Sequence, residues 1–230
     1  MLKIENRIRI PESKTSGMDC LEDCADKKHY LSYAKDITYW YNSRGFRDME
    51  WPEDLSDVIW CVGDSFTVGI GQPIGETWPQ LLQEKTGKRC LNLGEDGCSN
   101  DTMALRIREI VQSHDPKTIV VMWSHLSRRR VNNINVQYDA NDFGDAEDLD
   151  NFIRNYEMVN ALPTALINLV IPRGLDNVDM IPSLKQRYPD LLFVKQLDYA
   201  RDGNHFDIKT SIGVCDWVAK KYNEFDKSSK

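Results

Sequence analysis

The hydrophobic positions of this chain gather into five short runs, each of the length of a β-strand. The runs cover residues 58–62, 90–93, 118–123, 166–171 and 191–194. Continuous apolar runs are typical of parallel strands, because helices cover both faces of a parallel sheet. Helical spacing of apolar residues falls between and after the runs, over residues 76–86, 101–113, 150–161, 178–187 and 206–223. This alternation predicts an α/β fold, a three-layer α/β/α sandwich around a five-stranded parallel, flavodoxin-like sheet.

The first 55 residues are polar and follow neither a helical nor a strand period. Asn42-Ser43-Arg44-Gly45 is typical of a turn, and aromatic residues are scattered around it. A segment this short and polar cannot bury a core alone. We therefore expect residues 1–55 to be an irregular lead-in that packs on one domain formed by residues 56–230. In that domain, Asn100 or Asp101 is the expected N-cap of the second helix.

Composition narrows the range of partners. The 230 residues carry 29 Lys and Arg against 36 Asp and Glu, a net charge of −7. This balance argues against nucleic-acid or acidic-membrane partners, since phosphate binding needs a cationic face. The first residues lack the apolar core of a signal peptide, and no run nears the roughly 18 apolar residues of a membrane span. We therefore expect a cytoplasmic protein without a membrane span.

Six cysteines are present, without the paired spacing of a zinc site. Cys20 and Cys24, with His29 nearby, form the one cluster that could bind a metal, but no second pair of ligands follows. Cys61 and Cys90 lie in apolar runs, where a reduced buried thiol is usual. The sequence therefore predicts no metal site.

The first apolar run ends in Gly63-Asp64-Ser65. In parallel sheets the functional residues lie at the carboxyl ends of the strands. A serine on a strand-to-helix turn has its hydroxyl at the mouth of the sheet and its N–H near a helix start, which suits a nucleophile and its oxyanion. Ser65 is therefore a candidate nucleophile, although a glycine-rich turn with Ser65 as a helix N-cap explains the same residues.

A nucleophilic serine needs a base, and Asp202-Gly203-Asn204-His205 after the fifth run offers one. An aspartate three residues before a histidine can reach Nδ1 of the ring and leave Nε2 free to accept a proton. Since Ser65 and His205 both follow strands of the same predicted sheet, we expect them at the same edge. The remaining histidines lie in the lead-in (His29), at a helix end (His114) and after the third run (His125).

These blocks, in this order, resemble the SGNH/GDSL hydrolases, a family of esterases and lipases. Gly63-Asp64-Ser65 is similar to the nucleophile block, Asn92 to Gly97 to the second block, and Asp202-x-x-His205 to the last. Residues 42–47 also resemble a lead-in found in some members. The resemblance spans residues 57–223 and implies a triad of Ser65, His205 and Asp202. It further implies oxyanion N–H groups from Ser65 and Gly97, and no cofactor.

The third block departs from the family pattern, Gly-x-Asn-Asp, whose Asn donates to the oxyanion. Here the third run ends in Met122-Trp123-Ser124-His125-Leu126-Ser127. Ser124 or His125 falls nearest to the missing Asn, and either side chain can donate a hydrogen bond. Loss of one oxyanion donor typically costs about 10²–10³ in turnover. We therefore expect a substitute donor, a reduced activity or a binding role.

The segment after this block is strongly charged. Arg128-Arg129-Arg130 precedes residues 139–150, which hold six acids and no base. The simplest interpretation is a solvated loop, and the alternative is a lid in which an arginine meets an acidic or polyhydroxylated substrate. Candidate substrate-binding residues are Asp64, Arg130 and Trp123, the last because an aromatic ring can stack on a sugar.

The sequence thus predicts a serine esterase that hydrolyses a small acyl ester or an O-acetylated carbohydrate. A non-catalytic glycan-binding module on the same fold and an acyltransferase remain alternatives. The acyl group, the alcohol and the oligomeric state are left open.

Overall fold

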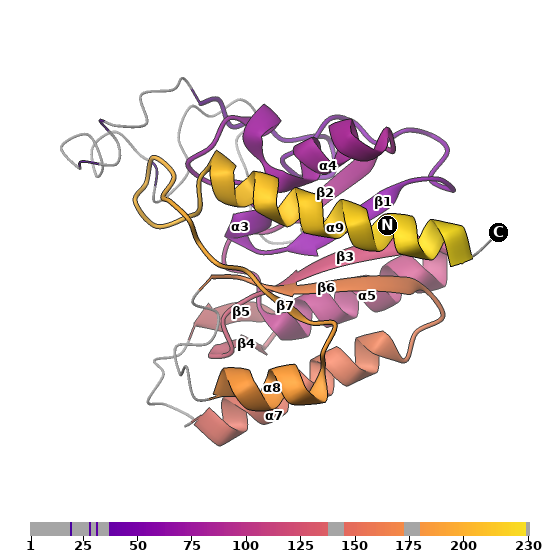
Figure 1. Ribbon diagram of the computed structural model, residues 1–230, viewed down its shortest axis with the longest axis vertical. Helices are drawn as coiled ribbons and strands as arrows, with labels where there is room; N and C mark the ends of the chain where they lie inside the picture. The colour runs from indigo at the N-terminus through magenta and orange to yellow at the C-terminus, as the bar shows by residue number, and fades with distance from the viewer. Residues whose placement is uncertain are drawn as a thin grey trace.

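Five parallel strands form the central sheet, and they coincide with the five apolar runs of the sequence (Figure 1). The structure is a computed structural model that describes residues 37–137, 145–172 and 180–228, together with residues 19, 28 and 31. The strands are β1 (Ile59–Gly63), β2 (Cys90–Gly94), β3 (Thr118–Trp123), β6 (Ala165–Val170) and β7 (Leu192–Phe193). Their order, β2-β1-β3-β6-β7, is the flavodoxin-like one. The predicted α/β fold is confirmed.

Helices cover both faces of the sheet, because successive strand residues point to opposite sides (Figure 1). One face carries α4 (Trp78–Thr86) and α9 (Ile208–Ser228), and the other carries α5 (Asn100–His114), α7 (Asp145–Asn160) and α8 (Met180–Arg187). Along β1, Trp60 and Val62 are buried in the core on the α5 side, whereas Ile59 and Cys61 are buried on the α4 side. Burial on both faces explains why the strands are continuous apolar runs.

The helix α5 is capped one residue earlier than the sequence analysis expects. Ser99 is its N-cap, and the Ser99 hydroxyl accepts the Thr102 N–H at 3.3 Å. The expected N-cap at Asn100 or Asp101 is therefore wrong, since both residues lie inside the first turn. Serine, asparagine and aspartate all favour N-caps, so the sequence alone leaves the register open.

Beyond β3 the chain forms a hairpin that the sequence analysis does not identify. Its strands, β4 (Arg128–Val131) and β5 (Ile134–Gln137), pair antiparallel around a turn in which Asn132 and Asn133 have positive φ. The hairpin docks at the start of α5, where Asn135 accepts the Ser99 hydroxyl at 2.8 Å. The hairpin therefore lies beside the N-terminus of α5, next to the carboxyl edge of the sheet.

The acidic stretch is partly helical rather than a solvated loop. The helix α7 begins at Asp145, and Asp148 is buried in an ion pair with Arg129 of β4. The loop prediction is therefore wrong for residues 145–150, which are helical, although Glu147 and Asp150 are exposed as predicted. Asp148 can be buried because Arg129 compensates its charge. Residues 139–144 lie outside the described residues.

The described part of the lead-in packs on the sheet domain. Ile37, Tyr39 and Phe46 are each at most 1% exposed, and Phe46 joins the core on the α5 side. The boundary at residue 55 stays a prediction. Among the described residues, no helix is long and apolar enough to span a membrane. Cys20, Cys24 and His29 lie outside the described residues.

Candidate active site

Ser65 begins the short helix α3 (Ser65–Val68) directly after β1, at the carboxyl edge of the sheet. Asp64 is the N-cap of this helix, since its carboxylate accepts the Phe66 N–H at 3.0 Å. The alternative in which Ser65 is itself the N-cap is therefore wrong, and α3 does not use the Ser65 hydroxyl for capping. Gly63 makes the turn possible, because a Cβ atom there would lie 2.0 Å from Thr67 Oγ1.

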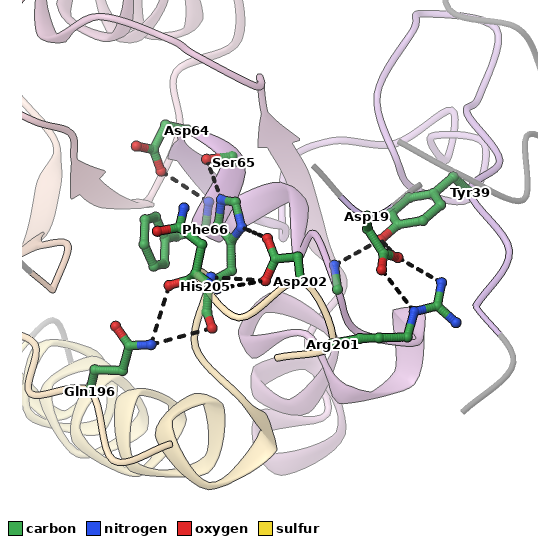
Figure 2. A network of polar contacts seen from close by, with 12 residues as sticks. Asp19, Tyr39, Asp64, Ser65, Phe66, Gln196, Arg201, Asp202 and His205 are labelled. Carbon is green, nitrogen blue, oxygen red and sulfur yellow. Dashed lines mark hydrogen bonds and ion pairs between the residues drawn. The ribbon is translucent and has the colours of Figure 1, made fainter. Parts of the chain in front are cut away.

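His205 reaches Ser65 from the loop between β7 and α9, 140 positions along the chain (Figure 2). Its Nε2 lies 2.7 Å from Ser65 Oγ, and its Nδ1 lies 2.5 Å from Asp202 Oδ2. The second oxygen of Asp202 accepts the backbone N–H groups of Asn204 and His205, at 3.1 and 3.0 Å. Because both carboxylate oxygens have partners, the imidazole is held in one orientation.

These three side chains are withdrawn from solvent. Ser65 is 3%, Asp202 5% and His205 2% exposed. The ring of Phe66 packs on the imidazole of His205 with 4.6 Å between ring centroids, and Phe206 packs on Phe66. The carboxylate group beside Nδ1 favours the tautomer of His205 that carries its proton on Nδ1, which leaves Nε2 as the acceptor that faces the serine. In this arrangement the imidazole can take the serine proton.

A second buried cluster surrounds the carboxylate of Asp64. Asp64 Oδ2 accepts from the Ser124 hydroxyl at 2.7 Å and from Arg128 Nη1 at 2.8 Å. Asp64 is fully buried, so the prediction that it binds substrate is wrong. Arg128, rather than the predicted Arg130, is the arginine that lies in this cluster. No local pattern separates Arg128 from the two arginines that follow it, because its contact with Asp64 depends on how the hairpin folds back.

Ser124 is not available to an oxyanion. Its hydroxyl donates to Asp64, and its backbone N–H donates to Asn100 Oδ1 at 2.8 Å. The prediction of Ser124 as the substitute donor is therefore wrong. His125 follows it with a partly exposed side chain, and its oxyanion role stays a prediction.

The loop that carries Gly97 is tied to the nucleophile strand. The Glu95 N–H donates to Gly63 O at 3.0 Å, and the Glu95 carboxylate pairs with Arg106 of α5 at 2.6 Å. Gly97 itself has φ +71, in the left-handed region that favours glycine. Burial raises the pKa of the neighbouring Cys98 thiol to about 12, so this thiol is not a competing nucleophile. The oxyanion role of the Gly97 N–H stays a prediction.

The two other candidate substrate contacts lie elsewhere. Trp123 is fully buried in the core, where its ring meets Phe152 edge-on at 5.8 Å and its Nε1 donates to Asn168. The prediction that Trp123 stacks on a substrate is therefore wrong. Arg130 is exposed on β4, and its backbone N–H donates to Asp101 at 3.0 Å. A substrate role for the Arg130 side chain stays a prediction.

Within the described part of the chain, no three His, Cys, Asp or Glu side chains are grouped so that they could hold a metal ion. The site itself offers acid–base and nucleophilic groups: a serine, a histidine and a carboxylate in hydrogen-bond contact.

Solved structures with the same fold are lipolytic proteins and carbohydrate esterases. One is described as a lipolytic protein of the G-D-S-L family from Desulfitobacterium hafniense. It is 12% identical, has a TM-score of 0.50, and the match covers 72% of this chain and 99% of that chain. Another is a carbohydrate esterase whose active site displays divergent catalytic and non-catalytic binding functions. It is 12% identical, has a TM-score of 0.50, and the match covers 76% of this chain and 67% of that chain.

A third neighbour is a family two carbohydrate esterase from Clostridium thermocellum in complex with cellohexaose. It is 15% identical, has a TM-score of 0.48, and the match covers 76% of this chain and 66% of that chain. No protein-family model and no curated protein sequence matches the chain. At these identities the comparisons show a shared SGNH-like fold, as the resemblance of the sequence blocks implies.

Proposed function

We propose that this protein is a serine hydrolase of acyl esters, with Ser65 as nucleophile, His205 as general base and Asp202 as the residue that orients the imidazole. The observation that carries the proposal is the continuous chain of contacts, 2.7 Å from Ser65 Oγ to His205 Nε2 and 2.5 Å from Nδ1 to Asp202. General base catalysis requires the base within about 2.6–3.2 Å of the atom that it deprotonates.

The reaction proceeds in two halves. Ser65 Oγ attacks the ester carbonyl carbon while its proton passes to Nε2 of His205, and Asp202 stabilises the imidazolium. Nε2 then returns the proton to the departing alcohol, and the acyl group remains bound to Ser65. A water molecule, deprotonated by the same Nε2, attacks the acyl carbon, and the proton on Nε2 restores the Ser65 hydroxyl as the acid leaves.

Three donors are proposed for the oxyanion. The Ser65 N–H lies in the first turn of α3, where backbone N–H groups have no partner inside the helix. The Gly97 N–H is the second donor, and the His125 side chain is the third in place of the family's Asn. Each such donor is typically worth about 10²–10³ in turnover.

The proposed substrate is a small acyl ester or an O-acetylated carbohydrate. The sequence blocks resemble a family that acts on such esters, and a carbohydrate esterase shares the fold. A non-catalytic glycan-binding module is the second candidate, because the third block lacks the Asn that donates to the oxyanion in the family pattern.

Hydrolysis of p-nitrophenyl acetate tests the proposal. The wild-type protein should release p-nitrophenol above the background, and Ser65→Ala should reduce the rate to the background. Ser113→Ala, an exposed serine near the last turn of α5, is the matched control and should keep the wild-type rate. Hydrolysis by Ser65→Ala at the wild-type rate would refute the proposal. A wild-type protein without activity would favour the binding module.

A further inference from the structure

A buried ion pair lies beside the loop between β7 and α9 that carries Asp202 and His205, which we call the acid–base loop (Figure 2). Neither residue of the pair belongs to the three side chains of the proposed reaction. Arg201, the residue before Asp202, donates to Asp19 with both ends of its guanidinium: Nε to Oδ1 and Nη2 to Oδ2, each at 2.7 Å. The side chain of Arg201 is 9% exposed and that of Asp19 is fully buried. Two-pronged pairing of this kind fixes both distance and orientation.

Tyr39 connects this ion pair to the turn that follows α3. Its hydroxyl donates to Asp19 Oδ2 at 2.8 Å and accepts the Gly71 N–H at 2.7 Å. Gly71 in turn accepts the Arg201 N–H on its carbonyl oxygen at 3.3 Å. The contacts form a closed circuit, so the turn after α3 and the acid–base loop are held against each other.

The junction at Gly71 has no spare room. Gly71 has φ +78, and a Cβ atom there would lie 2.8 Å from Ala200 Cβ and 3.2 Å from Asp202 Oδ1. A change in the separation of the two segments would therefore be transmitted directly to the carboxylate that orients His205.

Arg47 extends the same cluster to the end of α3. Its guanidinium packs over the Tyr39 ring, 4.2 Å from the centroid, and Nη1 donates to the carbonyl oxygens of Val68 and Gly69 at 3.2 and 2.5 Å. Its Nη2 donates to Gln72 O at 2.8 Å. Burial raises the pKa of Tyr39 well above its ordinary value, so the hydroxyl stays protonated and can donate.

We propose that Asp19, Tyr39 and Arg201 are positioning residues for the reaction of Ser65. They set the separation of the turn after α3 from the loop that carries Asp202 and His205, and hence the contact between Nε2 and Oγ. The inference rests on the proposed function. A misplacement of about 1 Å in such a contact can cost about 10²-fold in turnover.

Tyr39→Phe is the sharpest test, because it removes the bridging hydroxyl and keeps the ring under Arg47. We expect kcat for p-nitrophenyl acetate to fall at least tenfold while KM changes less than twofold. The matched control is Tyr188→Phe, which also removes a tyrosine hydroxyl bound to a carboxylate, that of Glu157 at 2.7 Å, away from Ser65. It should keep kcat within twofold. A kcat within twofold of wild type in Tyr39→Phe overturns the proposal.

Arg201 supplies a second variant in case Tyr39→Phe does not fold. Arg201→Lys keeps the charge opposite Asp19 but loses the two-pronged contact, so kcat should again fall with little change in KM. Arg187→Lys, at the exposed Arg187–Glu157 pair, is its control. Unchanged kcat in Arg201→Lys also overturns the proposal.

A measurement on the resting protein separates this inference from the proposed function. The proton on His205 Nδ1 should give a low-field NMR resonance, which Tyr39→Phe shifts or broadens and Tyr188→Phe leaves in place. If the wild type hydrolyses nothing, the proposed function fails, and this comparison still decides the positioning role. An unchanged resonance in Tyr39→Phe then overturns it.

Discussion

Replacing Arg128 by methionine removes the cation that faces the buried carboxylate of Asp64. The two side chains are 11% and 0% exposed, and Nη1 lies 2.8 Å from Oδ2. In Arg128→Met the Asp64 carboxylate keeps the Ser124 hydroxyl and the Phe66 N–H as donors but loses its counter-charge. The substitution therefore leaves an uncompensated charge in the protein interior.

The expected cost follows from this burial. Removal of one partner from a buried ion pair typically destabilises by about 3–5 kcal/mol. Because two neutral donors to Asp64 remain, we expect the lower end, about 3 kcal/mol. For a chain of this length that loss lowers Tm by about 6–12 °C, at about 2–4 °C per kcal/mol.

A double-mutant cycle with Asp64→Asn isolates the pair. Urea denaturation of the four proteins should give a coupling energy of about 2 kcal/mol or more, since the double variant has no buried charge left to compensate. The exposed pair of Lys209 and Asp198, with side chains 66% and 48% exposed, is the control and should couple by less than about 1 kcal/mol. A coupling of Arg128 to Asp64 as small as that of the control contradicts the reasoning.

Further substitutions test other parts of the structure. Gly71→Ala should lower kcat about tenfold or more, because its Cβ would press on Ala200 and on the acid–base loop; esterase assays check this. Burial lowers the pKa of His114, so the unfolded state takes up the proton first as pH falls through about 6.5. The free energy of unfolding should therefore fall more between pH 7 and 5.5 in wild type than in His114→Gln. With Cys20 and Cys24 replaced by serine, Ellman's reagent should react only after denaturation, because the described cysteines are buried: Cys61, Cys90, Cys98 and Cys215.

The sheet was readable from the sequence because burial on both faces leaves a continuous apolar signal. Trp60 and Cys61 face opposite cores, and both must be apolar. The contact between Ser65 and His205 was predictable for a related reason, since parallel strands bring their carboxyl ends to one edge. That prediction needed only the positions of the two residues after their strands.

The contacts around Asp64 could not be predicted from the sequence, because they depend on tertiary geometry. Ser124 stands near the place of the missing Asn, but its hydroxyl points to the buried carboxylate. Arg128 contacts Asp64 and Arg130 does not because of how the hairpin is placed. Its strand β4, Arg-Arg-Arg-Val, has no alternation of polar and apolar residues that would predict a strand. The turn at Asn132 and Asn133 was the available signal, since asparagine tolerates the positive φ of a tight hairpin.

Intact-protein mass spectrometry after treatment with a fluorophosphonate tests the nucleophile most directly. This reagent phosphonylates an activated serine, so wild type should gain the mass of one phosphonyl group, and peptide mapping should locate it at Ser65. Ser65→Ala should gain no mass under the same conditions, whereas Ser113→Ala should react as wild type does. A phosphonyl group on a residue other than Ser65, or an unmodified wild type, would contradict the account.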